Sequence, residues 1–173
     1  MAKIDFIIPL IFKWEGGLSN RNEDRGGLTN MGITLTTWKS CGYDKDGDGD
    51  IDAEDLKLLT KEDVINLLRK YYWNRWKADE LKNQSVANFL VDWLWNSGAW
   101  GIKIPQRIIG AFPDGIVGPE TLRLVNSKNQ EDLFEQLKEA RIAFVKDICR
   151  KDAKQNANLH GWLNRIDNFT FKL

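Results

Sequence analysis

Residues 14–34 read WEGGLSNRNEDRGGLTNMGIT and interrupt a chain in which apolar residues otherwise recur at helical spacing. Two glycine pairs, at residues 16–17 and 26–27, give the backbone room to bend and to approach a ligand closely, but they add no packing of their own. The same stretch contains Glu15, Asp24 and Thr29. The pattern predicts a glycine-rich loop or small hairpin whose shape matters more than its contribution to a core.

The chain that leads into this stretch is predicted to be helical. Phe6, Leu10 and Trp14 recur every four residues and form one face of a helix that the first glycine pair ends. Glu15 therefore falls at the carboxyl end of a helix. Pro9 fits either the first turn of this helix or a kink within it.

Helix signals continue through the rest of the chain. The sequence TKED at residues 60–63 has the form of a capping box and opens a helix that is predicted to run to about Tyr72. Pro105 is expected just before or within the first turn of another helix, and Pro119 at the first position of the next. Two long helical runs are predicted at residues 83–96 and 130–151. The fold is predicted to be mainly α, with at most a small hairpin between residues 18 and 34.

Length and composition indicate one compact protein. The 173 residues are 42% apolar and 11% aromatic, which suffices for one well-buried core, so residues 1–173 are predicted to form a single domain. No stretch approaches the roughly 20 apolar residues of a membrane span, and the start MAKIDFIIPLIF lacks the features of a secretory signal. We therefore expect synthesis in the cytoplasm without a signal peptide and no stable membrane insertion. Cys41 and Cys149 lack metal-type spacing and are expected to be reduced thiols.

The formal net charge of zero hides a strong segregation of charge. Residues 44–55 carry seven acidic side chains and one lysine, so the rest of the chain has six more Lys and Arg than Asp and Glu. A mildly cationic surface favours an anionic polymer such as cell wall or nucleic acid. Charge alone does not choose between these two partners.

Glu15 is the best candidate for acid catalysis. A carboxyl group at a helix end, beside the ring of Trp14, lies in partly apolar surroundings that favour its proton-donating form. A loop that folds back would bring Asp24 and Thr29 to face it across a groove. Glycosidic hydrolysis uses such a pair, because one acid protonates the departing oxygen while a second oxygen group stabilises the oxocarbenium-like state or positions water. The alternative is a helix-capping glutamate followed by a turn-rich loop whose polar side chains satisfy the backbone.

Two other classes of hydrolase are disfavoured by the residues present. His160 is the single histidine, and no serine lies in a GxSxG sequence. Neither cysteine lies near a histidine in the sequence. Serine and thiol hydrolase chemistry therefore has weaker support than carboxylate chemistry.

A cluster of aromatic residues surrounds an asparagine in the middle of the chain. Its members are Tyr71, Tyr72, Trp73, Trp76, Trp93, Trp95 and Trp100. Sugar rings present apolar faces with a rim of hydroxyls, so aromatic side chains with an amide suit a glycan. Tyr72 and Asn96 are predicted to line a substrate groove. The alternative is core packing, which is typical of aromatic residues at helical spacing and is predicted for the others.

Residues 44–55, DKDGDGDIDAED, match a twelve-residue EF-hand-like calcium loop. Such a loop takes oxygen ligands at positions 1, 3, 5, 7, 9 and 12, with glycine at position 6, where Gly49 stands. The predicted ligands are Asp44, Asp46, Asp48, Asp50 through its carbonyl, Asp52 and Asp55. Position 12 holds Asp rather than Glu, so the expected affinity is weak, roughly 10⁻⁵ to 10⁻³ M. The alternative is a solvated acidic loop without an ion.

In its motifs and in their order along the chain, the sequence resembles the N-acetylmuramidases of glycoside hydrolase family 108. This is a lysozyme-like group found in phage endolysins and bacterial secretion-activator proteins. The match begins with EGG and DxGGxTxxGI in residues 15–33 and continues through the chain. The later segments are DLKLLT, YYWNRWKADEL, VDWLWNSG, DGIVGPETL and GWLNRI. The resemblance implies a lysozyme-like helical fold with Glu15 as the catalytic residue. Asp24 and Thr29 would complete a triad similar to that of phage-type lysozymes, although the spacing of the threonine differs slightly.

The resemblance also implies a function. It predicts a lysozyme-type N-acetylmuramidase that cleaves the β-1,4 bond between N-acetylmuramic acid and N-acetylglucosamine with Glu15 as general acid. Residues 1–98 would carry the catalytic motifs, and residues 99–173 would form a peptidoglycan-binding part packed on them. Calcium would be structural, because the chemistry needs no metal, and the acidic loop is a departure from the family.

Two rival classes remain open. One is a peptidoglycan-binding or secretion-assisting protein with weak or no hydrolysis. The other is a calcium-responsive interaction protein, which is disfavoured because it needs paired calcium loops and a Met-rich groove, whereas this chain has one such loop and two methionines. In the preferred reading a holin or another export route delivers a monomer to the periplasm or the cell exterior, and nucleic acid is not a partner.

Overall fold

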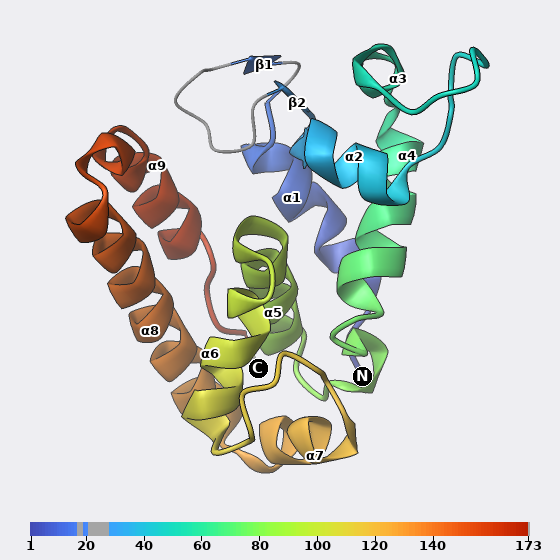
Figure 1. Cartoon of the computed structure of the whole chain (residues 1–173). Coiled ribbons are helices and arrows are strands. Elements are labelled where there is room, and N and C mark those ends of the chain that lie inside the picture. The colour runs from blue at the N-terminus through green and yellow to red at the C-terminus, as the bar shows by residue number, and fades with distance from the viewer. Residues whose placement is uncertain (17–18, 21–27, 173) are drawn as a thin grey trace. The chain divides into compact units, whose positions relative to one another are not determined.

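The structure is a computed structural model, and it describes residues 1–16, 19–20 and 28–172 (Figure 1). The chain forms two compact units. Residues 8–69 form one, which we call the hairpin unit, and residues 1–7 together with 70–173 form the other, which we call the bundle unit. Both are built mainly of helices, as the sequence predicts. In the described part of the chain, no helix combines the length and apolar character needed to cross a membrane.

Within its described residues, the hairpin unit contains three short antiparallel strands in the order β1-β2-β3. The strands are β1 (Ser19–Asn20), β2 (Leu28–Asn30) and β3 (Ile33–Thr34). In the register of β2 with β3, Thr29 faces Thr34. The helices of this unit are α1 (Ile8–Trp14), α2 (Leu35–Cys41), α3 (Ala53–Lys57) and α4 (Lys61–Leu67). The small hairpin expected between residues 18 and 34 is thus present.

Threonine caps start two of these helices. Thr34 ends β3, and its Oγ1 accepts a hydrogen bond from the amide of Thr37, so α2 follows the strand without a loop. Thr60 and Asp63 form the predicted capping box at the start of α4, because each side chain accepts from the backbone amide of the other residue. The sequence predicted the capping box of α4, whereas the Thr34 cap of α2 was not predicted.

A buried asparagine joins the hairpin to the helix that follows the acidic loop. Asn30 ends β2 and is 6% exposed, and its Nδ2 donates to the carbonyl of Leu56 in α3 at 2.8 Å. A buried amide is stabilising only when its polar atoms are paired. The bond therefore fixes the β2–β3 hairpin relative to α3 within this unit.

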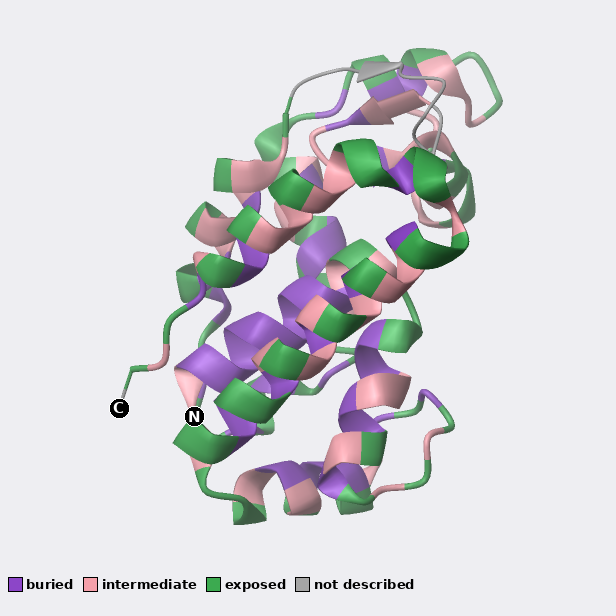
Figure 2. Cartoon of the chain, turned by 90° about the vertical axis from the view of Figure 1, so that its left-hand side faces the viewer, coloured by how far each residue is buried: buried purple, intermediate pink, exposed green. Residues whose placement is uncertain are grey.

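The bundle unit is built around α5 (Gln84–Ser97), in which ten consecutive residues, Ser85–Leu94, are buried. Figure 2 shows this helix almost entirely in the colour of buried residues. A helix that is buried on all sides forms the centre of a core. Phe89 in its middle has edge-on contacts with Trp93, Phe134 and Phe169.

Four further α-helices in the described part of the bundle unit surround this centre. They are α6 (Trp100–Ile109), α7 (Pro119–Ser127), α8 (Gln130–Lys151) and α9 (Asn156–Asp167). Short 3₁₀ helices cover Ile4–Phe6, Ala78–Glu80 and Ala153–Gln155. In Figure 1, α8 and α9 lie side by side. The backbone of α6 approaches α5 closely, because a Cβ on Gly101 would lie 2.4 Å from the amide nitrogen of Leu94.

Most predicted helix boundaries agree with the structure, and two details differ. Pro9 lies in the first turn of α1, and Pro119 is the first residue of α7. The helix predicted to run to Tyr72 changes after α4 into a π-helical stretch, Leu68–Trp73. The prediction that Pro105 starts a helix is wrong, because α6 already begins at Trp100 and contains the proline. Gly98 ends α5 and the next helix follows at once, so no room remains for a loop before Pro105.

Candidate functional site

Glu15 lies directly after α1 in the hairpin unit. Its amide donates to the carbonyl of Ile11 at 3.1 Å, so the last turn of the helix is complete and the side chain leaves from the helix end. This is the position that the sequence predicts. The side chain is half-buried.

The carboxylate of Glu15 lies against the turn that joins β2 to β3. Gly32 in this turn has a φ of +83°, and a Cβ added to it would lie 2.4 Å from Oε2 of Glu15. Only a residue without a side chain allows the backbone this close. Met31, the other turn residue, has a φ of 47°, so both residues have the positive φ values typical of a two-residue type I′ turn. The residues of this turn form part of the sequence pattern, but the role of Gly32 was not predicted.

Thr29 is half-buried and belongs to β2, three residues before this glycine. Glu15 therefore contacts the turn of the same hairpin that carries Thr29. Asp24 lies outside the described residues. The catalytic roles predicted for Glu15, Asp24 and Thr29 stay predictions.

The two residues predicted to bind substrate belong to the bundle unit. Tyr72 lies in the π-helical stretch and is half-buried, with its ring centroid 4.7 Å from that of Trp95. Asn96 is exposed near the end of α5, and its Nδ2 donates to the carbonyl of Asp92 at 3.1 Å. A tilted aromatic pair and an exposed amide are groups that can contact a sugar. Their contact with substrate stays a prediction.

The other members of the aromatic cluster are mostly in the core. Trp73, Trp76 and Trp93 are fully buried, as expected. The expectation of a core position is wrong for Trp100, which is 49% exposed at the start of α6. Its neighbours Ala99 and Asn96 are exposed too, because the short connection after α5 lies at the surface.

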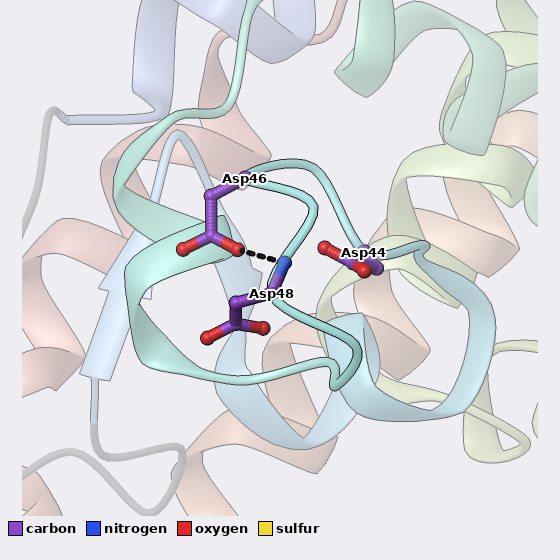
Figure 3. Close-up of side chains that lie close together, drawn as sticks. All are labelled: Asp44, Asp46 and Asp48. Carbon is purple, nitrogen blue, oxygen red and sulfur yellow. Dashed lines mark hydrogen bonds between the residues drawn. The ribbon is translucent and has the colours of Figure 1, made fainter.

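The acidic loop gathers its carboxylates in two groups. One oxygen from each of Asp44, Asp46 and Asp48 lies within 4.8 Å of the others (Figure 3). A second group is formed in the same way by Asp50, Asp52 and Asp55. Figure 3 shows that Asp46 accepts a hydrogen bond from the amide of Asp48, at 3.2 Å. The loop therefore holds the predicted ligand residues in two separate groups, and calcium binding stays a prediction.

Asp55, at position 12 of the loop, is fully buried and fastens the loop ends together. Its carboxylate accepts from the amides of Asp52 at 2.8 Å, Lys45 at 2.5 Å and Asp46 at 3.1 Å. These backbone donors, Asp52 first, lower the pKa of Asp55. The pKa of Asp50 is raised instead, mainly by the negative charge of Asp48. Hydrogen bonds thus hold the ends of the loop at the buried Asp55, whereas the carboxylates of Asp48 and Asp50 repel each other.

The lysine of this loop pairs with the cap of α4. Lys45 Nζ lies 2.9 Å from Oδ2 of Asp63, and the hydroxyl of Tyr43 donates to Oδ1 of Asp63 at 2.8 Å. Burial alone would raise the pKa of the Asp63 carboxyl. The hydrogen bonds from Thr60, Lys45 and Tyr43 outweigh this effect and lower the pKa to about 2.

Asp63→Asn is expected to lower the free energy of unfolding by about 1 kcal/mol near neutral pH, because it removes a cap and a charged acceptor. The folded pKa lies below the unfolded value of 3.8, so the contribution is complete above pH 3.8 and is lost as the pH falls toward 2. Urea unfolding of both proteins between pH 2 and 7 measures this. Asp132→Asn, an exposed acid in the first turn of α8, is the control. A stability difference that does not depend on pH would contradict the assignment.

The sequence matches two family models. Residues 8–98 match the model described as Glycosyl hydrolase 108, and residues 100–167 match the model described as Predicted Peptidoglycan domain. The first match alone covers more than half of the chain. The chain belongs to the glycosyl hydrolase 108 family. The resemblance found in the sequence motifs is thus confirmed, and peptidoglycan is the polymer that this family member cuts or binds.

A solved structure supports the same assignment. The structure of SagA from Brucella abortus is similar to this glycosyl hydrolase 108 chain with a TM-score of 0.79 and 29% sequence identity. The similarity covers 95% of this chain and 90% of the SagA chain. A comparison with curated proteins finds no match.

The family matches and the compact units have different boundaries. The first match ends at residue 98, at the end of α5, whereas the compact units divide between residues 69 and 70. Helix α5 therefore belongs to the first family match. It nevertheless packs in one compact unit with the helices of the second family match, residues 100–167. The organisation of residues 1–173 as one domain stays a prediction.

Proposed function

We propose that this protein is an N-acetylmuramidase that hydrolyses the β-1,4 bond between N-acetylmuramic acid and N-acetylglucosamine, with Glu15 as general acid. The observation that carries the proposal is the place of the Glu15 carboxylate, at the end of α1 against the glycine turn of the β2–β3 hairpin. The turn packs its backbone, rather than a side chain, directly against the acid and so fixes the position of the carboxylate. The stretch that matches the glycosyl hydrolase 108 model contains all of these residues.

In the proposed reaction Glu15 gives its proton to the glycosidic oxygen as the bond to the anomeric carbon breaks. Charge then develops on the sugar ring as an oxocarbenium-like state. Asp24 and Thr29 are proposed to stabilise this state or to position the attacking water. None of these steps requires a metal. Tyr72 and Asn96 are proposed to contact the sugars through the aromatic face and the amide.

Product analysis tests the bond that is cut. Purified sacculi are digested, and the soluble products are reduced and examined by mass spectrometry. A muramidase leaves N-acetylmuramic acid at the new reducing end, a glucosaminidase leaves N-acetylglucosamine, and an amidase releases peptides. Products that end in N-acetylglucosamine would contradict the proposal.

A second function is favoured by the match of residues 100–167 to a predicted peptidoglycan domain. In this alternative the protein binds the wall, or assists secretion across it, with weak or no hydrolysis. Turbidity of a cell-wall suspension separates the two functions, because binding alone leaves the turbidity unchanged.

Gly32→Ala is expected to reduce wall lysis by about 10- to 100-fold. The added methyl group would overlap the Glu15 carboxylate, and the φ of +83° is unfavourable for alanine, so the acid must move from its place. Initial rates of lysis measure the effect, and thermal unfolding shows how much of it comes from stability. Gly47→Ala is the control, since Gly47 also has a positive φ of +81° but open space around its Cα. Equal loss in both variants would mean that backbone strain rather than the carboxylate contact is responsible.

We also propose that the acidic loop binds one calcium ion with a structural role. The support is the order of oxygen donors along the loop, the grouping of their carboxylates and the repulsion that raises the pKa of Asp50. Asp44, Asp46, Asp48, Asp52 and Asp55 would supply carboxylates, and Asp50 its carbonyl. Peptidoglycan lies outside the cytoplasmic membrane, so the proposed place of action is one where calcium reaches millimolar levels. Delivery by a holin or another export route is part of this proposal.

Millimolar calcium is expected to raise the melting temperature relative to chelator by several degrees. At 100 times the Kd a ligand stabilises the folded state by about 2.7 kcal/mol, and the stabilisation falls with the logarithm of the ratio of ligand concentration to Kd. Differential scanning fluorimetry with calcium, magnesium or chelator measures this. The control is Asp48→Asn, which removes one ligand charge from an exposed position and should reduce the shift. An unchanged melting temperature with calcium would refute the proposed ion.

A further inference from the structure

Three large apolar side chains lie at the surface of α6 and of the loop that follows it. Trp100 is 49% exposed, Phe112 is 82% exposed and Ile116 is 68% exposed. Trp100 begins α6, and the other two belong to residues 110–118, the loop that joins α6 to α7 (Figure 1). Single apolar side chains at a surface are common, but a group of them is typical of an interaction site.

Lys103 connects the members of this group. Its Nζ lies 6.0 Å from the centroid of the Trp100 ring, and a Cβ added to Gly115 would lie 3.2 Å from its Cε. The lysine side chain therefore reaches from Trp100 to the residue that precedes Ile116. The exposed ring on the helix and the exposed side chain in the loop thus belong to one surface.

The side chain of Gln106 holds this loop in place. Gln106 is fully buried, and its Nε2 donates to Oδ1 of Asp114 at 2.9 Å and to the carbonyl of Ile116 at 3.0 Å. Its Oε1 accepts from the amide of Gly115 at 2.9 Å, and Oδ1 of Asp114 accepts from the amide of Ile116 at 2.8 Å. The amide of Ile116 first, and then Gln106, lower the pKa of Asp114, so this acceptor is ionised at neutral pH. A loop that is ordered before it meets a ligand loses less conformational freedom on binding.

Two cations lie on the same side of α6 as Trp100. Lys103 and Arg107 follow Trp100 by three and seven positions, which places the three along one side of a helix. In the part of the chain that the structure describes, neither cation forms an ion pair, although the charge of Lys103 helps to lower the pKa of Asp114. We call Trp100, Lys103, Arg107, Phe112 and Ile116 the loop face. It combines apolar area with positive charge.

We propose that the loop face binds the peptide that peptidoglycan carries on its muramic acid residues. These peptides are short, contain several alanines and carry free carboxylates. Their methyl groups match the apolar area of Trp100, Phe112 and Ile116, and their carboxylates match the charges of the two cations. The occupant rests on the proposed function, in which peptidoglycan is the polymer, and the loop face lies in the stretch that matches the predicted peptidoglycan domain.

The glycan strand fits the loop face less well than the peptide does. An aromatic ring can pack on a sugar, but the rim of hydroxyls also needs hydrogen-bonding side chains close by. The amide of Gln106 is buried and bonded within the loop, and Oδ1 of Asp114 accepts two bonds there. The side chains of the loop face itself are apolar or cationic. Their chemistry therefore favours the peptide over the sugar chain.

Calorimetry with the full-length Glu15→Gln protein tests the loop face without cutting the ligand. The probes are a soluble disaccharide-peptide, its peptide released by an amidase, that peptide with its carboxylates converted to amides, and the peptide-free disaccharide. We expect the released peptide to bind about as tightly as the disaccharide-peptide. Amidation is expected to weaken binding roughly fivefold, because it removes the attraction to exposed cations. Binding of the peptide-free disaccharide but not of the peptide would identify the glycan as the ligand and overturn the proposal, as would no measurable binding of the peptide.

Substitutions locate the binding at the loop face. Phe112→Ser with Ile116→Ser removes two exposed apolar side chains, and Leu58→Ser is the matched control, since Leu58 is 49% exposed in the hairpin unit. Arg107→Met removes one cation, and Arg150→Met is its control, because Arg150 is exposed in α8 and pairs with Asp147. Peptide affinity is expected to fall at least about tenfold in the double variant and about two- to fivefold in Arg107→Met, with no loss in the controls.

The double variant decides the proposal. Unchanged affinity for the peptide, or an equal loss in the leucine control, overturns the loop face as the binding site. Circular dichroism reports folding, which should be unchanged because both side chains point to solvent. If the double variant does not fold, Phe112→Ser alone decides by the same criterion.

The same substitutions separate this proposal from the proposed hydrolysis. Digestion of sacculi by the proteins with Glu15 intact is measured in parallel. A protein that leaves muramic acid at new reducing ends, but binds the peptide equally with and without the loop substitutions, refutes the loop face alone. A protein that binds the peptide through the loop face but cuts no wall refutes the hydrolysis alone.

Discussion

Glu15→Gln is expected to reduce wall lysis by about 100- to 10,000-fold, the range that general acid catalysis contributes. Glutamine has nearly the same shape as glutamate and keeps a hydrogen-bonding oxygen, but it has no proton that it can give to the glycosidic oxygen. The carboxylate lies against Gly32 with no space for a larger group, so an isosteric change preserves the packing. Initial rates on purified sacculi measure the loss, and thermal unfolding should be unchanged within about 2 °C.

The control for this experiment is Glu62→Gln, an exposed glutamate in the first turn of α4. Its lysis rate should match that of the unchanged protein. If Glu15→Gln retains full lysis, Glu15 is not the proton donor, and the acid must be sought elsewhere in residues 8–98. If both variants lose lysis equally, the loss reflects surface charge on the anionic wall rather than proton transfer. Only a selective loss in the first variant supports the proposed chemistry.

The local features of this fold are readable from the sequence because neighbouring residues determine them. The capping box of Thr60 and Asp63 and the proline start of α7 depend on contacts within one helical turn. The position of Glu15 at a helix end follows in the same way from the glycines beside it. The order of carboxylates in the acidic loop is also local, and the structure gathers them in two groups, while calcium binding stays a prediction.

Contacts between distant segments account for what the sequence did not predict. The approach of Gly32 to Glu15 depends on how the β2–β3 turn folds back on α1, and a glycine in a pattern does not say which side chain it meets. The bond from Asn30 to Leu56 joins a strand to a helix across the acidic loop. Pairing of Asp92 with Arg165 joins residues 73 positions apart. An aspartate inside an apolar helix signals a buried partner, but the sequence offers 25 lysines and arginines to choose from.

Asp92→Asn is expected to destabilise the bundle unit by about 3–5 kcal/mol, the cost of removing one member of a buried ion pair. The carboxylate is the common partner of Arg141 and Arg165, so its loss removes an anionic partner from both buried cations. Burial would raise the pKa of Asp92, but the charges of Arg165 and Arg141 outweigh it and hold the pKa below the ordinary value. At about 2–4 °C per kcal/mol for a chain of this size, the melting temperature should fall by roughly 10 °C or more.

The destabilisation caused by Asp92→Asn depends on pH in a defined direction. The folded pKa lies below the unfolded value of 3.8, so the stabilisation by Asp92 is complete above pH 3.8 and is lost as the pH falls below it. The gap between the original protein and Asp92→Asn should therefore be constant near neutral pH and close in acid. Asp167→Asn is the control, because Asp167 is 79% exposed and pairs with Lys138 at the surface, where such pairs contribute about 0–1 kcal/mol.

A triple variant separates the effect of the buried charges on stability from the effect of side-chain packing. In Asp92→Leu with Arg141→Met and Arg165→Leu, the whole charged cluster becomes apolar, and buried ion clusters replaced in this way often keep or gain stability. We expect urea unfolding to show a stability close to that of the original protein, far above that of Asp92→Asn. If the triple variant is as unstable as the single one, packing rather than unpaired charge explains the loss.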